Sequence, residues 1–136
     1  MFDIEVVLCI YVFGSNENGE PSITCGFVKQ EDGRLTLPSV KLGLNKFCSE
    51  SVSNIISDNI QADIQTLDVV QVGFFDRIVE KNRGETRNVV LAYKTHVLPG
   101  TPVNKNLVFY THKEIEIIRN KIQEGHYEAY RIGFNR

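Results

Sequence analysis

The stretch SESVSNIISDNIQADI, residues 49–64, decides the fold that the sequence predicts. Its apolar residues Val52, Ile55, Ile56 and Ile60 follow the spacing i, i+3, i+4, i+8, which places them on one face of a helix. The positions between them are polar. We therefore expect a helix that packs this apolar face against a core and leaves the opposite face in water.

Sequence patterns typical of strands occur both before and after this predicted helix. They are short runs rich in β-branched and aromatic residues, bounded by Gly, Pro, Asn or Asp. The runs are residues 4–13, 23–28 and 34–37 before the helix, and residues 67–78, 88–98 and 107–110 after it. Residues 79–87, between two of these runs, are mostly charged or polar, so we expect a surface loop there.

A second helix is predicted near the C-terminus. The sequence THKE, residues 111–114, is a capping box, which starts a helix. The apolar stripe Ile115, Ile118 and Ile122 follows, and Gly125 ends the pattern. The tail, residues 126–134, predicts either a last strand or an aromatic strip that covers the core.

The order of strands, helix, strands and helix predicts an α+β or α/β sandwich with helices packed on a mixed sheet. At 136 residues the chain fits a single domain, residues 1–136. Cys9, Cys25 and Cys48 are odd in number and are not spaced like zinc ligands. We expect buried thiols in a reducing compartment.

Charge and the N-terminal sequence exclude two kinds of partner. A net charge of -2 argues against a broad nucleic-acid surface. The N-terminus has no basic region, and the apolar run 6–13 is too short to cross a bilayer. We therefore expect a cytoplasmic protein that does not enter a membrane.

From Glu50 onward the chain keeps the spacing of a known family. Seven residues separate Glu50 from the stretch DNIQADIQT, residues 58–66. This pattern resembles the box G-x5-E-x7-R-E-U-x-E-E-x-G-U of the Nudix hydrolases, where U is a bulky aliphatic residue, here Ile60. Residues 37–38, Leu-Pro, are similar to the turn before the box, whereas Gly43 lies one residue too far from Glu50.

A second resemblance lies downstream. The stretches LDVVQVGFFDR (residues 67–77), RG (residues 83–84) and VVLAY (residues 89–93) are similar to Nudix proteins related to ADP-ribose hydrolases. They also resemble the Nudix-like effector domain of NAD-metabolism repressors. The resemblance implies an α/β/α sandwich, with a Nudix-like mixed sheet flanked by helices, and a nucleotide or dinucleotide-type small molecule as the ligand.

The departures from the family fall on its chemistry. The box places three carboxylates at i, i+3 and i+4, where they hold Mg²⁺ or Mn²⁺. Carried over, these positions are Asn59, Ala62 and Asp63, and the Arg of the box has become Asp58. Glu50, Asn59 and Asp63 are the candidate metal ligands that remain, and a polar exposed helix flank is the alternative. The resemblance thus implies no cofactor for binding, and Mg or Mn for any hydrolysis.

Candidate ligand-binding residues lie in the downstream segment. Guanidinium groups match the oxygens of a phosphate or diphosphate, and an aromatic ring can stack on a base. The candidates are Gln71, Phe74, Arg77, Arg83 and Arg87. Core packing of the phenylalanine and a solvated loop for the last two arginines are the alternatives. We expect the ligand between the loop after Pro38, the first helix and the strand at residues 71–77.

Three functions follow from these patterns. The leading hypothesis is a divergent Nudix-fold domain, catalytically impaired, that binds a nucleotide, an ADP-ribose-like diphosphate or a protein partner. The alternative is a Mg- or Mn-dependent hydrolase of a nucleoside diphosphate derivative, with Glu50, Glu80 and Glu85 as catalytic candidates, the last two on a mobile loop. The third is an assembly or regulatory protein. Since Nudix proteins are often homodimers, a homodimer is a further expectation.

Overall fold

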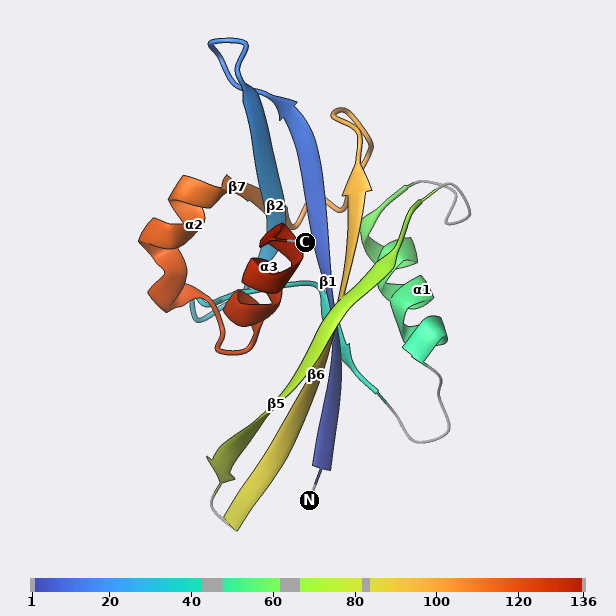
Figure 1. Ribbon diagram of the computed structural model, residues 1–136, viewed down its shortest axis with the longest axis vertical. Coiled ribbons are helices and arrows are strands. Elements are labelled where there is room, and N and C mark those ends of the chain that lie inside the picture. The colour runs from blue at the N-terminus through green and yellow to red at the C-terminus, as the bar shows by residue number, and fades with distance from the viewer. Residues whose placement is uncertain (1, 43–47, 62–66, 82–83, 136) are drawn as a thin grey trace.

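The described strands, seven in number, form one mixed sheet with helices on both of its faces (Figure 1). The computed structural model describes residues 2–42, 48–61, 67–81 and 84–135, and for residues 2, 74–81 and 84–87 it gives the backbone alone. The strand order is β3-β2-β1-β6-β5, with β4 paired to β1 and β7 paired to β2. The predicted α+β class, with helices packed on a mixed sheet, is confirmed.

The elements up to α2 follow the predicted order with differences at their ends, except that β4 was not predicted, and the C-terminal tail forms the helix α3. The strands are β1 (Phe2–Ser15), β2 (Pro21–Lys29), β3 (Leu35–Thr36), β4 (Ser39–Lys41), β5 (Val70–Lys81), β6 (Gly84–Val97) and β7 (Leu107–Thr111). The helices are α1 (Cys48–Asn59), α2 (His112–Ile118), the 3-10 helix η2 (Arg119–Lys121) and α3 (His126–Asn135). Within the described part of the chain, no helix has the length and apolar character needed to cross a membrane.

β1 is the central strand, and both of its faces are covered. It pairs with β6 in parallel and with β2 antiparallel. Its side chains alternate between two hydrophobic clusters, one under α3 and one under α1. The residues toward α3 are Val7, Cys9 and Tyr11, and those toward α1 are Val6, Leu8 and Ile10. A strand buried on both faces needs apolar residues at every position, which explains the uninterrupted apolar run.

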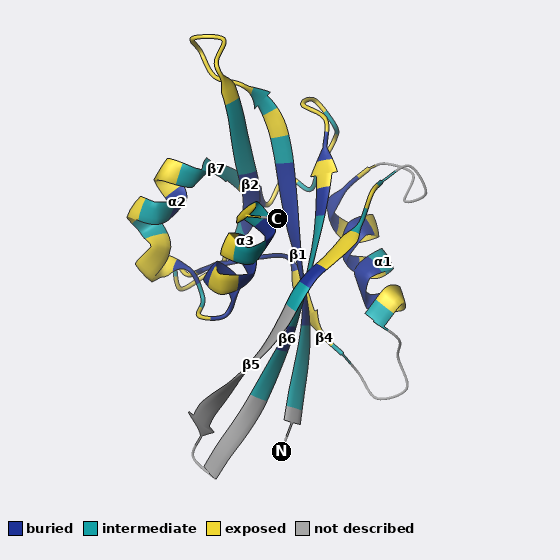
Figure 2. Ribbon diagram, in the orientation of Figure 1, coloured by how far each residue is buried: buried dark blue, intermediate teal, exposed yellow. Residues whose placement is uncertain are grey.

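Helix α1 lies on one face of the sheet, and its inner side is buried (Figure 2). Val52, Ile55 and Ile56 pack against the same cluster as the β1 residues on this face. Ile60 is also buried there, directly after the helix ends. The helix predicted from the spacing of these residues is confirmed, because one-sided burial requires that spacing.

The predicted capping box starts α2. The Thr111 hydroxyl accepts the N–H of Glu114 at 3.2 Å, and the Glu114 carboxylate accepts the N–H of Thr111 at 2.9 Å. The helix is shorter than predicted, because it ends at Ile118 and η2 follows. Gly125 then takes a φ of 90°, in the left-handed region that glycine adopts without strain.

The C-terminal tail is helix α3, so the prediction of a last strand is wrong. Its buried residues Tyr127, Tyr130 and Gly133 recur every third position and lie on one helical face. The Glu128 carboxylate accepts the N–H of Gly125 at 2.7 Å, which satisfies a main-chain donor at the start of the helix. The alternative prediction, an aromatic segment that covers the core, is confirmed.

β5 and β6 form a long antiparallel hairpin that extends past the helices (Figure 1). β5 continues to Lys81, β6 begins at Gly84, and Glu80 pairs with Glu85. The prediction of a surface loop over residues 79–87 is therefore wrong, and so is the placement of these two glutamates on a mobile loop. Strand pairing uses main-chain N–H and C=O groups, so polar side chains do not prevent it.

The predicted buried thiols are present at two of the three cysteines. Cys9 and Cys25 are buried, and the Cys9 thiol lies 3.6 Å from the carbonyl oxygen of Ala129. Burial raises the pKa of Cys9 to about 12 and the pKa of Cys25 well above its ordinary value. Both side chains are therefore neutral thiols at physiological pH, and a thiol without thiolate character is unreactive.

Candidate functional site

A cavity of about 290 Å³ lies between α1 and the turn that joins β3 to β4. We call it the α1 pocket. Its described lining includes Gln30, Thr36, Pro38, Asn54, Asp58 and Asn59. The pocket thus brings the helix that resembles the Nudix box next to the turn that resembles the Leu-Pro turn of the family.

The turn beside the pocket is held from both sides by hydrogen bonds. The carbonyl oxygen of Pro38 accepts the N–H of Leu8 on the central strand at 2.9 Å. The N–H of Leu37 donates to Nδ1 of the buried His126 at 2.9 Å. Because a main-chain N–H can only donate, Nδ1 carries no proton, and Nε2 donates to the Glu5 carboxylate at 2.7 Å. Glu5 and His126 thereby fix the position of the turn.

Asn59, which the resemblance places at the first of the three carboxylate positions 59, 62 and 63, is buried. Its amide nitrogen donates to the carbonyl oxygen of Ile55, one turn earlier in the same helix, at 2.8 Å. This bond ties the amide to its own helix and leaves the side-chain oxygen and one N–H for other partners. Asp58, beside it, is exposed.

The described box residues do not fit a divalent-cation site. Mg²⁺ requires oxygen ligands in a near-octahedral arrangement, with anionic groups among them. Asn59 supplies one neutral oxygen, and Glu50 lies exposed in the first turn of α1, where its charge interacts favourably with the helix dipole. Among the described residues there is no group of three or more His, Cys, Asp or Glu that could hold a metal ion. Asp63, the third candidate ligand, lies outside the described residues.

Three of the predicted ligand-binding residues, Gln71, Phe74 and Arg77, lie in β5, at the opposite edge of the sheet from the turn between β3 and β4. β5 is an edge strand, and β6 and β1 separate it from β2 and β3. Gln71 is exposed there, next to an irregularity in the pairing with β6. The backbone places Phe74 opposite Leu91 and Arg77 opposite Asn88. The structure therefore brings the turn and α1 together, but it does not bring Gln71 to the α1 pocket.

The remaining predicted residues are placed only by the backbone or not at all. Arg87 lies in β6, opposite Ile78 of β5 and Phe2 of β1. Glu80 and Glu85 are paired near the end of the hairpin, as described above. Arg83 lies outside the described residues.

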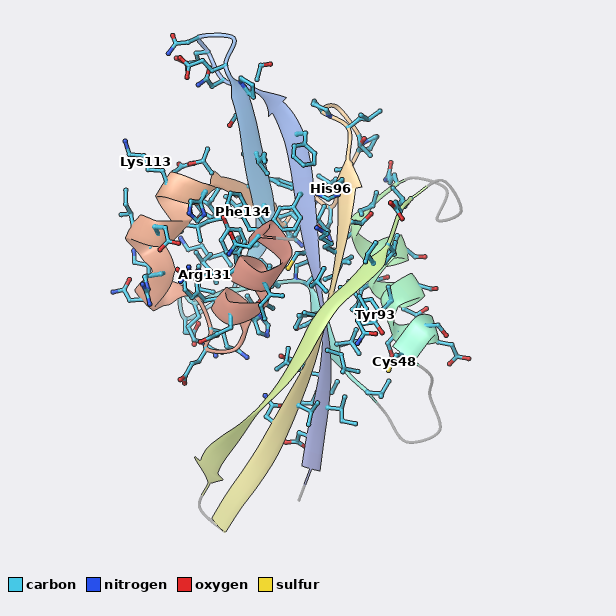
Figure 3. All side chains as sticks on the ribbon, in the orientation of Figure 1. Cys48, Tyr93, His96, Lys113, Arg131 and Phe134 are labelled. Atoms are coloured by element: carbon cyan, nitrogen blue, oxygen red, sulfur yellow. The ribbon has the colours of Figure 1, made fainter. Side chains whose placement is uncertain are left out.

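A second cavity, of about 440 Å³, lies between α1 and β6. Ser53 and Ile56 of α1, Asp68 before β5 and Tyr93 of β6 are among its lining residues. Figure 3 shows Tyr93 close to Cys48 at the start of the helix. Burial, with a smaller electrostatic contribution from Cys48, raises the pKa of Tyr93 above its ordinary value.

Gln30, Thr36, Asn54 and His126 are not among the residues that the sequence predicts for the site. Thr36 directly precedes the Leu-Pro turn, and Gln30, at the end of β2, donates to it through a hydrogen bond of 2.9 Å from Gln30 Nε2 to Thr36 Oγ1. The position of Thr36 next to that turn is the signal that could have found it. His126 carries no such signal, because its partner Glu5 lies 121 positions away.

Replacing Asn59 by Asp is expected to destabilise the fold by about 1–3 kcal/mol. A carboxylate cannot donate to the carbonyl of Ile55, and it would add negative charge to the negative end of the helix dipole. Urea unfolding followed by circular dichroism measures the loss. Asn54→Asp is the matched control, because Asn54 is exposed one turn earlier and should shift stability by less than about 0.5 kcal/mol. Equal losses in the two variants would contradict this account.

No protein-family model and no curated protein matches this sequence. Its fold, by contrast, is similar to many solved structures. A mutT/nudix family protein from Listeria innocua superimposes with a TM-score of 0.73 at 11% identity, over 98% of this chain and 92% of the other. The NUDIX domain of Shewanella oneidensis NrtR, complexed with ADP ribose, superimposes with a TM-score of 0.66 at 10% identity, over 98% and 86%.

A third similar structure is a bifunctional NMN adenylyltransferase/ADP ribose pyrophosphatase from Francisella tularensis. It has a TM-score of 0.67 at 15% identity and covers all of this chain and 41% of that larger protein. Identities in this range show a common architecture and do not by themselves transfer an activity. The chain therefore has the Nudix fold.

Proposed function

We propose that this chain is a ligand-binding Nudix-fold domain that holds a nucleotide or an ADP-ribose-like molecule in the α1 pocket and hydrolyses it poorly. The observation that carries the proposal is the state of Asn59. At a position where the family's box has a metal-binding carboxylate, a buried amide is hydrogen-bonded to its own helix.

Asn59 should impair hydrolysis without preventing ligand binding, because only hydrolysis needs a bound metal. Cleavage of a diphosphate needs a metal that neutralises developing charge and acidifies the attacking water. An amide supplies neither the charge nor the geometry that holds such an ion. A pocket with a rigid turn and polar walls can still bind. Support for a nucleotide-type ligand comes from the neighbouring folds, one of which is complexed with ADP ribose and another with AMP and a manganese ion.

Thermal melting with ADP-ribose, NAD and nucleotides, each with and without Mg²⁺, tests the proposal. A ligand that binds the folded state alone at 100 times its Kd stabilises that state by about 2.7 kcal/mol. We expect a shift in melting temperature with at least one of these ligands, unchanged by Mg²⁺. We also expect Asn54→Leu to weaken binding about tenfold, because it removes a polar partner in the pocket. Asn120→Leu removes the same amide from the exposed η2 and should leave the shift unchanged.

Two other outcomes would reject the proposal in different directions. Mg²⁺-dependent release of AMP or phosphate, abolished by Glu50→Gln or Asp63→Ala, would establish the hydrolase. Absence of a shift with every ligand would favour the assembly or regulatory protein, and size-exclusion chromatography with light scattering then gives the mass of any complex or homodimer. Each outcome identifies one of the three functions that the sequence predicts.

A further inference from the structure

We infer that the second cavity, between α1 and β6, binds a small organic cation in which a primary ammonium group is joined to an apolar ring or chain. We call this cavity the β6 cavity. It shares no described lining residue with the α1 pocket, so the inference goes beyond the proposed function and does not depend on it.

The β6 cavity has the size and the apolar lining that the carbon part of such a ligand needs. Its volume of about 440 Å³ lies within the range of about 300–1,000 Å³ that is usual for pockets that enclose a small molecule. Four aliphatic side chains line it: Val52 and Ile56 of α1, and Leu67 and Val69 just before β5. All four belong to or pack against the hydrophobic cluster under α1, so a ring placed against them leaves water.

The charge of the lining favours a cation. Asp68 is an exposed carboxylate, and no lysine, arginine or histidine is among the described lining residues. The positive end of the α1 dipole also lies at this end of the helix, but Glu50 in the first turn offsets it. A cation in the cavity therefore meets an opposite charge, whereas an anion is repelled.

The basic residues of β6 that flank Tyr93 do not supply a competing charge. Side chains alternate between the two faces of a strand, and the Lys94 ammonium donates to the carbonyl oxygen of Gly133 in α3 at 3.3 Å. Partial burial and the charge of Lys94 lower the pKa of His96, so its imidazole is uncharged at neutral pH. The negative charge of Asp68 is thus available to a ligand.

Tyr93 and two serines offer further contacts to an ammonium group. Figure 3 shows Tyr93 beside α1, and an aromatic ring attracts a cation placed over its face. The hydroxyl groups of Ser49 and Ser53 can accept hydrogen bonds, and an ammonium group has three N–H donors. A divalent metal ion, by contrast, would find one anionic oxygen ligand here, which is too few to replace its water.

Three probes of similar shape and different charge test the inference: 2-phenylethylamine, 2-phenylethanol and phenylacetate. In a two-dimensional NMR titration of the full chain, we expect a Kd of about 1 mM for the amine. The neutral alcohol should bind about fivefold more weakly, and phenylacetate more weakly still. The methyl resonances of Val52 and Val69 should move with the amine, whereas those of Val108, exposed on β7, should stay in place.

Two substitutions test the named contacts. Asp68→Asn should weaken binding of the amine about fivefold and leave the alcohol unchanged, which removes the preference for the cation. Tyr93→Leu should also weaken the amine more than the alcohol, because leucine keeps an apolar wall and lacks the aromatic ring. Glu17→Gln is the control for Asp68→Asn, since it removes the same charge from the exposed turn between β1 and β2 and should alter neither Kd.

The outcomes that overturn the inference are distinct from those that reject the proposed function. Equal binding of the amine and the alcohol, tighter binding of phenylacetate, or no movement of Val52 and Val69 with any probe would overturn it. Equal effects of Asp68→Asn and Glu17→Gln would also overturn it, because the attraction would then come from the general surface charge. None of these results bears on the α1 pocket, which the melting experiments with ADP-ribose, NAD and nucleotides test separately.

Discussion

Gly133→Ala is expected to lower the free energy of unfolding by about 2 kcal/mol, against the usual helical preference for alanine. A methyl group at this position would lie 2.6 Å from the Tyr11 hydroxyl and 3.4 Å from two carbons of its ring. Tyr11 is buried and donates that hydroxyl to the carbonyl oxygen of Tyr130 at 2.8 Å. The ring therefore cannot retreat without losing its hydrogen bond. Urea unfolding measures the change.

The same substitution should be tolerated once the hydroxyl is removed. In a Tyr11→Phe background the closest remaining atoms are the ring carbons at 3.4 Å, at the edge of ordinary contact. Alanine is then expected to be neutral or stabilising by up to about 1 kcal/mol, because its helix propensity is no longer opposed by a clash. The double-mutant cycle isolates the contact between the two residues. A loss of the same size in both backgrounds would show that the tyrosine hydroxyl is not the cause.

His126→Ala is expected to cost about 3–5 kcal/mol, because it leaves a nearly buried carboxylate and a buried main-chain N–H without their partner. The His126 side chain is 1% exposed and that of Glu5 is 15% exposed. His126→Gln should recover about half of the loss, since its side-chain oxygen can accept from Leu37 and its nitrogen can donate to Glu5. Urea unfolding gives the stability of each variant.

An NMR measurement at Leu37, in the turn beside the α1 pocket, distinguishes the hydrogen-bonding role of His126 from a general contribution to packing. The amide resonance of Leu37 should move in the Ala variant and return toward its original position in the Gln variant, because that N–H bonds to residue 126. His96→Ala is the control, since His96 is exposed and its loss should change stability by about 0.5 kcal/mol or less. If the Ala and Gln variants lose the same stability, the two hydrogen bonds contribute nothing measurable.

Elements with a strong local pattern could be predicted from the sequence. The spacing of Val52, Ile55 and Ile56 predicts α1, because a helix on a core must repeat its apolar residues on one side. The apolar run of β1 predicts a strand buried on both faces. The capping box predicts the start of α2 at the correct residue, because its two bonds form within four residues.

Elements whose pattern is ambiguous could not be predicted. Tyr127 and Tyr130 are compatible with an irregular strand and with a helical face, and short apolar patterns do not distinguish the two. Packing decides in favour of the helix, because the carbonyl of Tyr130 accepts from Tyr11, which lies 119 positions earlier. The strands at residues 67–78 and 88–98 were predicted, but not the extension of β5 to Lys81 and of β6 back to Gly84, since main-chain pairing is independent of side-chain polarity.

The candidate site likewise has residues that a local sequence pattern predicts and contacts that no local pattern predicts. Asp58, Asn59 and the Leu-Pro turn could be found from the spacing of the box, and the structure places them around one cavity. The hydrogen bond that commits Asn59 to Ile55 depends on burial, and the support of the turn by Glu5 and His126 depends on a contact between the two ends of the sequence. Neither is encoded in a local pattern.

The parallel pairing of β1 with β6 has a consequence for biosynthesis. Phe2 pairs with Arg87, and their separation is 87 - 2 = 85 positions. At about 5–20 residues per second, the ribosome needs several seconds to make the distant partner after the first strand has appeared. During that time one of the most apolar segments of the chain has an unpaired edge, which is the kind of surface that aggregates or recruits chaperones. Expression yield should therefore depend more on chaperone supply and on growth temperature than the stability of the finished fold would suggest.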